Sequence, residues 1–198
     1  MAAGATASGA GAAPGWLYHH LTASGPAEPL AAFVAAARGS GVVPWRHDLT
    51  ALEEDVFNLA VAQPPGQRRL SVAGCRILAR QFRAQLAAHQ GRAAARARHD
   101  QACPFDLHAL LPVPDSALQR GPADPQALAW LAAHWGVTDQ LRHVVLRHGA
   151  TAGRRLPAGH RVAGYGFFAD GSTPHAALAQ LGLRWPALRF VLQPRPAG

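Results

Sequence analysis

The sequence contains no lysine, only two cysteines and no long uncharged apolar segment, and each shortage narrows what the protein can be. All nineteen basic side chains are arginine. Cys75 and Cys103 are too few for a disulfide framework and fit a reducing compartment. No uncharged apolar segment reaches the roughly 20 residues of a membrane span. Residues 1–15 lack the basic start and branched apolar run of a signal peptide. We therefore predict a cytoplasmic protein that does not enter a membrane.

Sequence motifs for catalysis and metal binding are also missing. The chain has no G-x-S-x-G motif and no glycine-rich phosphate loop. Eleven histidines are present, but neither H-x-x-x-H nor C-x-x-C spacing occurs. The sequence therefore assigns no catalytic residue, no metal ligand and no cofactor.

The charge is strongly one-sided. Nineteen arginines against eleven acidic residues give a net charge of +8. Arginine binds phosphate in a bidentate manner and stacks on flat rings, so the excess favours contact with nucleic acid. The alternative explanation is codon usage, because an Ala-, Gly-, Arg- and Pro-rich chain without lysine is typical of a GC-rich genome.

Length and composition predict one domain. The chain has 198 residues, of which 49% are hydrophobic, enough for a real core. Residues 1–15 are mostly Ala, Gly, Ser and Thr and predict a disordered tail. Residues 16–196 form the predicted domain, and 42–101 have the character of a helical insertion within it.

The insertion predicts two helices. A capping box at Thr50–Glu53 begins the first, and the Pro64-Pro65-Gly66 segment ends it. The second runs from about Leu70 to Arg98. Its arginines project together at i, i+4 and i+7, namely Arg76, Arg80 and Arg83. They predict either a stripe that contacts phosphate or the solvated outer face of an ordinary packed helix.

The remainder of the domain alternates strands and helices. The predicted strands are 16–23, 105–111, 141–147, 160–168 and 188–192. Helices are predicted after Ser24, over 124–135 and after Thr173, and a hairpin loop over 151–159. This order is close to the split βαβ pattern of a ferredoxin-like fold, in which an antiparallel sheet carries helices on one face. The predicted fold class is therefore α+β, a ferredoxin-like sheet with an inserted helical hairpin.

Several short motifs occur in a recognisable order. They are Leu21-Thr-Ala-Ser-Gly-Pro26, Pro104-Phe-Asp-Leu-His-Ala-Leu-Leu-Pro-Val-Pro114, His134-Trp-Gly136, Phe168-Ala-Asp-Gly-Ser-Thr-Pro174 and Trp185-Pro-Ala-Leu-Arg-Phe190. In this order they resemble the YubB-type ferredoxin-like domain family, which occurs on phages, plasmids and related mobile elements. The resemblance implies the fold and a mobile-element association, and it brings no activity.

The segment Gly164-Tyr-Gly-Phe-Phe168 suggests a way to bind a ligand. It resembles part of the aromatic strand motif of RNA-recognition domains. Alternation along a strand places Tyr165 and Phe167 on one face and Phe168 on the other. On an open face, Tyr165 and Phe167 would stack bases. The alternative is that both rings lie beneath helices.

Two further features allow more than one interpretation. Trp135 precedes Gly136 at a helix end, where it either anchors the core or stacks on a ligand. Cys103 or a pair of histidines could share a pocket with Asp106 or Asp139, as a small enzyme would require. Asp106, between two apolar residues, is expected to face solvent or the arginine-rich helix.

The functional prediction is a non-catalytic binding protein of a mobile-element-associated family. The partner is either another protein or single-stranded nucleic acid. In the second case Arg76, Arg80 and Arg83 would contact phosphate, while Tyr165 and Phe167 would stack bases. A small enzyme is the third alternative.

Overall fold

The computed structural model describes residues 15–147 and 156–195. Nearly all of the predicted tail at 1–15 lies outside these ranges, as does most of the predicted loop at 151–159. The described part of the chain is an α+β protein with seven helices and one open, four-stranded antiparallel sheet. The predicted fold class is therefore confirmed at the level of an α+β protein with an antiparallel sheet.

The sheet has two long central strands and two shorter edge strands. Strand β1 (Trp16–Pro26) pairs with β3 (His160–Asp170) along its whole length. Strand β4 (Arg189–Arg195) pairs with the other side of β1, and β2 (Arg142–Arg147) pairs with β3. The order across the sheet is β2-β3-β1-β4, and every neighbouring pair is antiparallel.

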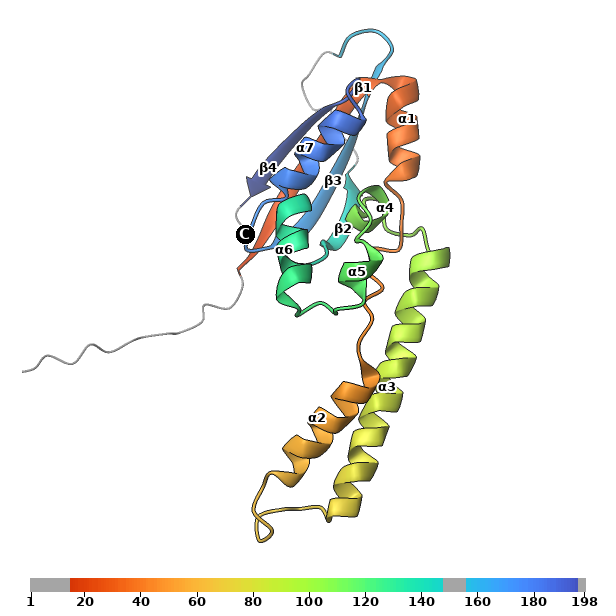
Figure 1. Ribbon diagram of the computed structural model, residues 1–198. Coiled ribbons are helices and arrows are strands. Elements are labelled where there is room, and N and C mark those ends of the chain that lie inside the picture. The colour runs from red at the N-terminus through yellow and green to blue at the C-terminus, as the bar shows by residue number, and fades with distance from the viewer. Residues whose placement is uncertain (1–14, 148–155, 196–198) are drawn as a thin grey trace, which may run out of the picture.

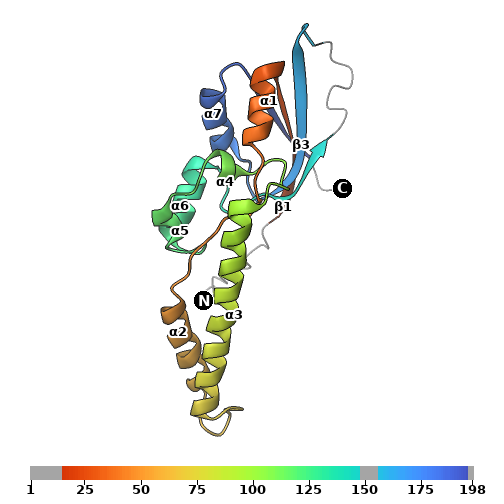
Figure 2. The same cartoon turned by 90° about the vertical axis from the view of Figure 1, so that its right-hand side faces the viewer.

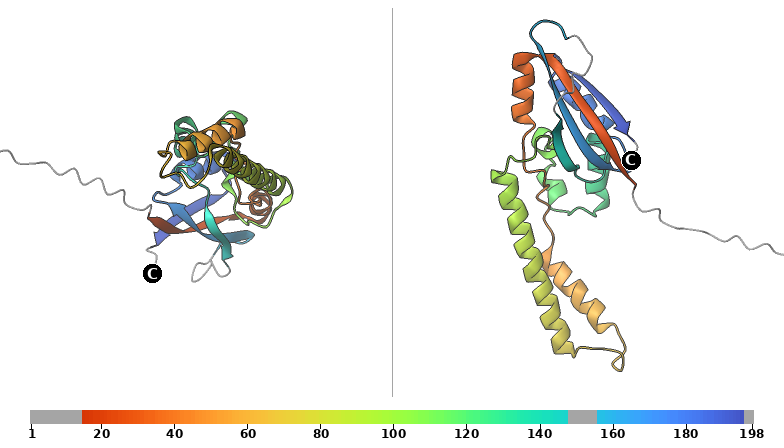
Figure 3. Two further views of the ribbon diagram at one scale, coloured as in Figure 1. Left: turned by 90° about the horizontal axis from the view of Figure 1, so that it is seen from below. Right: turned by 180° about the vertical axis from the view of Figure 1, so that it is seen from behind.

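The helices cover a single face of the sheet. Helices α1 (Ala27–Ala36), α6 (Pro125–His134) and α7 (His175–Arg184) lie on that side, as do the one-turn helices α4 (Leu107–Leu110) and α5 (Asp115–Leu118). The core forms between this layer and the sheet. Seen from behind, the other face of the sheet has no helix over it in the described part of the chain (Figure 3).

A helical hairpin extends away from the sheet (Figures 1 and 2). It consists of α2 (Leu49–Val61) and α3 (Val72–His99), which lie side by side. Helix α2 begins earlier than the predicted capping box, because the Asp48 carboxylate accepts hydrogen bonds from the N–H groups of Thr50 and Ala51. No residue of α2 is fully buried, and α3 buries only Cys75 and Ala79.

The predicted strand at 105–111 is wrong. This segment contains α4, whose first turn is capped by Asp106 through the N–H of His108 at 2.8 Å. Asp106 also accepts from the N–H of Gly41 at 2.9 Å and is buried, whereas the sequence predicted that it faces solvent or the arginine-rich helix. A short apolar run suits a buried helical turn as well as a buried strand, because periodicity does not separate them.

None of the helices in the described ranges combines the length and apolar character that crossing a membrane requires.

Candidate nucleic-acid interface

The two faces of the sheet differ in chemistry because side chains alternate along each strand. On β1, His19, Leu21 and Ala23 are buried beneath the helices. The intervening residues point to the opposite side, which we call the open face. Directly paired residues share a face, so the register assigns the neighbouring strands as well. Tyr18 pairs with Phe168, and His20 pairs with Gly166.

Tyr165 and Phe167, the predicted base-stacking pair, lie on the covered face. Both are 0% exposed. The ring of Phe105 packs against them, with centroid distances of 5.1 Å to Tyr165 and 5.8 Å to Phe167. Burial raises the pKa of Tyr165 to about 12, and its hydroxyl has no hydrogen-bond partner in the described structure. The prediction that these rings stack on a ligand is therefore corrected: the helices already cover them.

The open face carries a different pair of aromatic rings. The ring centroids of Tyr18 and Phe168 lie 4.8 Å apart, with the planes tilted by 47°. Both residues are half-buried, unlike the fully buried Tyr165 and Phe167. Gly166 leaves the space that the Tyr18 hydroxyl occupies, since a Cβ at this position would displace the Tyr18 side chain. The missing side chain lets the Tyr18 ring lie across β3 next to Phe168.

Exposed arginines accompany these rings. Arg142 pairs with Phe168, and Arg147 pairs with Gly164, so both belong to the open face. Arg189 lies on the same face of β4 but farther away, opposite Ser24, which is six residues along β1 from Tyr18. All three are exposed. Cationic groups beside aromatic rings on an accessible surface can bind a ligand that combines flat rings with negative charge.

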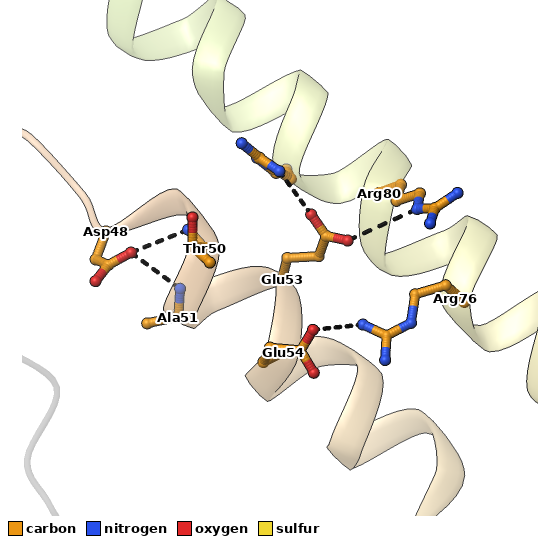
Figure 4. A network of polar contacts seen from close by, with 8 residues as sticks. Asp48, Thr50, Ala51, Glu53, Glu54, Arg76 and Arg80 are labelled. Carbon is orange, nitrogen blue, oxygen red and sulfur yellow. Dashed lines mark hydrogen bonds and ion pairs between the residues drawn. The ribbon is translucent and has the colours of Figure 1, made fainter.

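The arginines of α3 form ion pairs with α2 (Figure 4). Arg76 lies 2.6 Å from the Glu54 carboxylate, and its guanidinium lies 3.5 Å from the centre of the Phe57 ring. Arg83 and Arg80 lie 3.0 Å and 3.8 Å from Glu53. The three guanidinium groups are therefore paired with acidic residues of α2 and link the two helices of the hairpin. Phosphate contact by these arginines stays a prediction.

Trp135, the candidate for ligand stacking, is a core residue. Its side chain is 1% exposed, and the indole N–H donates to the carbonyl of Leu111 at 3.0 Å. Gly136 follows with φ at 79°, a left-handed conformation that ends the helix and favours glycine. The ligand-stacking prediction for Trp135 is therefore corrected.

The candidate enzyme residues occupy structural positions. Burial raises the pKa of the Cys103 thiol, which keeps it protonated and weakly nucleophilic. Burial lowers the pKa of His108, whose Nδ1 accepts from the N–H of Val113 at 3.1 Å. Asp106 caps α4, while Asp139 lies 2.7 Å from Arg142. Within residues 15–147 and 156–195, no three His, Cys, Asp or Glu side chains gather in a way that could hold a metal ion.

Sequence reasoning missed Tyr18, although it placed Phe168 on the opposite face from Tyr165. The alternation along β1 was visible, and it separates Tyr18 and His20 from His19 and Leu21. The alternation of residues along the strand does not indicate which face of the sheet the helices cover.

Comparisons with protein-family models, with curated proteins and with solved structures find no match to this chain.

Proposed function

We propose that this protein is a non-catalytic binding protein and that the open face of its sheet binds single-stranded nucleic acid. The observation that carries the proposal is the contact between the rings of Tyr18 and Phe168, beside Gly166 and with Arg142 opposite Phe168 on β2. Aromatic rings on a sheet stack on unpaired bases, while arginines contact the phosphates.

The ligand class follows from the chemistry of the face. Bases in a duplex are already stacked on their neighbours, whereas those of a single strand can lie flat on protein rings. Arg147 and Arg189 supply the positive charge that a phosphate backbone requires, one on each edge strand, while Arg142 is paired with Asp139. The sequence placed the nucleic-acid site at Tyr165 and Phe167. We now propose that the site lies on the opposite face of the same strands.

The proposal extends to the finer description of the fold. A ferredoxin-like topology is supported by the strand order β2-β3-β1-β4 and by α1 and α7, which follow β1 and β3 along the chain. The hairpin of α2 and α3 then interrupts the connection between α1 and β2. Membership of the YubB-type family and its mobile-element association stay predictions from the sequence motifs.

The test is a fluorescence-anisotropy titration with labelled mixed-sequence single-stranded RNA and DNA, at low and near-physiological salt. We expect binding that weakens as salt increases and persists at physiological salt. Tyr18→Ala should weaken it by roughly 5- to 150-fold, because stacking contributes about 1–3 kcal/mol per base. Thermal unfolding of the same variant checks that the fold is retained.

A matched variant on the other face is Tyr165→Phe. It keeps the core ring and removes only the unpartnered hydroxyl, so affinity should not change. Binding that disappears at physiological salt, or that is equally strong in Tyr18→Ala, would contradict the proposal. A protein partner would then become the better prediction.

A further inference from the structure

An open hollow lined by aromatic rings lies at one edge of the open face. Its volume is about 300 Å³, and it is lined by Trp16, Arg142, His143 and Phe168. Trp16 begins β1 and shares the face of Tyr18 through the alternation of the strand. Phe168 belongs both to this hollow and to the pair that it forms with Tyr18.

The backbone is distorted where the hollow forms. The register between β2 and β3 shifts between Arg142 and Val145, which is the mark of a bulge. His143 has φ at 50° and is the one residue other than glycine in the described ranges with a positive φ. Such a conformation costs about 1–3 kcal/mol and persists where the surroundings require it, often at binding sites.

The distortion places the His143 ring against Phe168. The two rings meet edge to face, with centroids 6.0 Å apart and planes at 83°. An ordinary strand residue at this position would follow the alternation and could not be aimed in this way. The bulge therefore builds one wall of the hollow.

Arg142 builds another wall and is held from two sides. Its guanidinium lies 4.3 Å from the centre of the Trp16 ring and 2.7 Å from the Asp139 carboxylate. A side chain that is already ordered loses less conformational freedom when a ligand binds. Arg142 and His143 also supply ring-edge and guanidinium nitrogen atoms that can bond to the polar edge of a base.

We propose that this hollow, which we call the bulge subsite, binds one nucleobase of a single strand whose neighbouring base stacks on Tyr18. This inference rests on the proposed function and adds a second, separate base position to it. The Phe168 ring separates the two positions, so consecutive bases occupy them. The aromatic walls take the ring, and the nitrogen atoms of Arg142 and His143 bond to its edge.

The test is an abasic scan with fluorescein-labelled single-stranded DNA tetranucleotides, each lacking one base, titrated into the full chain. In the wild-type protein, removal of the base at the bulge subsite should weaken binding by roughly 5- to 150-fold. In His143→Gly the removal of the same base should lower the affinity by less than about twofold, because the His143 ring no longer holds that base.

His143→Gly is the informative variant, since glycine adopts a positive φ without strain. Its thermal stability should equal or exceed that of the wild type while its selectivity for the base is lost. Trp16→Ala is the second variant and should show the same loss at the same position. Tyr18→Ala is the comparison variant: it should abolish the loss of affinity caused by removing the neighbouring base, while removal of the base at the bulge subsite should still weaken binding by more than it does in His143→Gly.

The bulge subsite would be overturned if removing any one base weakened binding equally, both in the wild type and in His143→Gly. Binding itself and the effect of Tyr18→Ala would still support the proposed function in that case. Absence of binding to a mixed-sequence oligonucleotide of about 20 nucleotides at physiological salt would overturn both.

Discussion

The covered face and the open face of the sheet carry similar residues with different consequences. On β3, Phe167 and Phe168 are neighbours in sequence, yet Phe167 is 0% exposed beneath the helices while Phe168 stays partly accessible beside Tyr18. On β1, His19 stacks on Phe167 with centroids 5.6 Å apart, while His20 belongs to the open face and contacts Arg147. A shift of one residue along a strand therefore separates a buried core position from a position on the open face, where we propose that a ligand binds.

The difference between the two faces is tested most strongly by truncating the two neighbouring phenylalanines. Phe167→Ala should lower the free energy of unfolding by about 3–5 kcal/mol, because it leaves a cavity between the sheet, Phe105 and His19. Phe168→Ala should lower it by about 1 kcal/mol, since solvent can fill the space. Urea denaturation of both variants measures the difference, and equal losses would show that the two faces are not distinct.

The buried histidine of the covered face predicts a pH dependence of stability. Burial lowers the pKa of His19, whose Nδ1 and Nε2 bond to the Leu17 carbonyl and the Thr173 hydroxyl. The folded protein therefore favours neutral His19, while the unfolded chain takes up a proton near pH 6.5. His108 shifts in the same direction because of its burial.

The free energy of unfolding should accordingly be highest above about pH 7 and fall as the pH drops below about 6.5. Urea denaturation between pH 5 and pH 8 checks this. His19→Gln should be less stable at pH 8 and should flatten the dependence. If the variant keeps the full slope, then His19 is not responsible for it.

The smallest expected effect compares two arginines of equal charge. Arg147→Gln removes a cation from the open face and should lower the slope of log affinity against log salt by about one, which corresponds to one phosphate contact. Arg80→Gln makes the same change in net charge on α3, where the guanidinium faces Glu53. Anisotropy titrations over a range of salt should find the slope of Arg80→Gln unchanged, and equal slopes in the two variants would mean that only net charge matters.

Much of the fold could be predicted from local sequence. The breaks at Pro64-Pro65-Gly66 and at Gly136 lie where helices end, and the alternation at 160–168 marks a strand of the sheet. The segment at 105–111 could not be assigned locally. Its conformation depends on Asp106, which accepts a hydrogen bond from the N–H of Gly41, a residue far away in the sequence. The isolated bridge between Gly39 and Cys103 holds these two segments side by side.

The candidate site was harder to predict than the fold. Both faces of β3 contain aromatic rings, and only the placement of α1, α6 and α7 decides which rings are covered. The ion pairs of the α3 arginines were equally hard to predict, because their partners Glu53 and Glu54 lie on another helix. The bulge at His143 has no signature in sequence, since a positive φ is uncommon for any residue but glycine.

NMR tests most directly whether the open face binds a single strand. The chain has a mass of 20.8 kDa, which is small enough for this method. A titration of isotope-labelled protein with a short single-stranded oligonucleotide, followed by amide and aromatic chemical shifts, locates the binding surface. We predict that the shifts concentrate at Tyr18, His20, His143, Val145 and Phe168. Shifts concentrated on α3 around Arg76, Arg80 and Arg83, with the open face unaffected, would contradict the account.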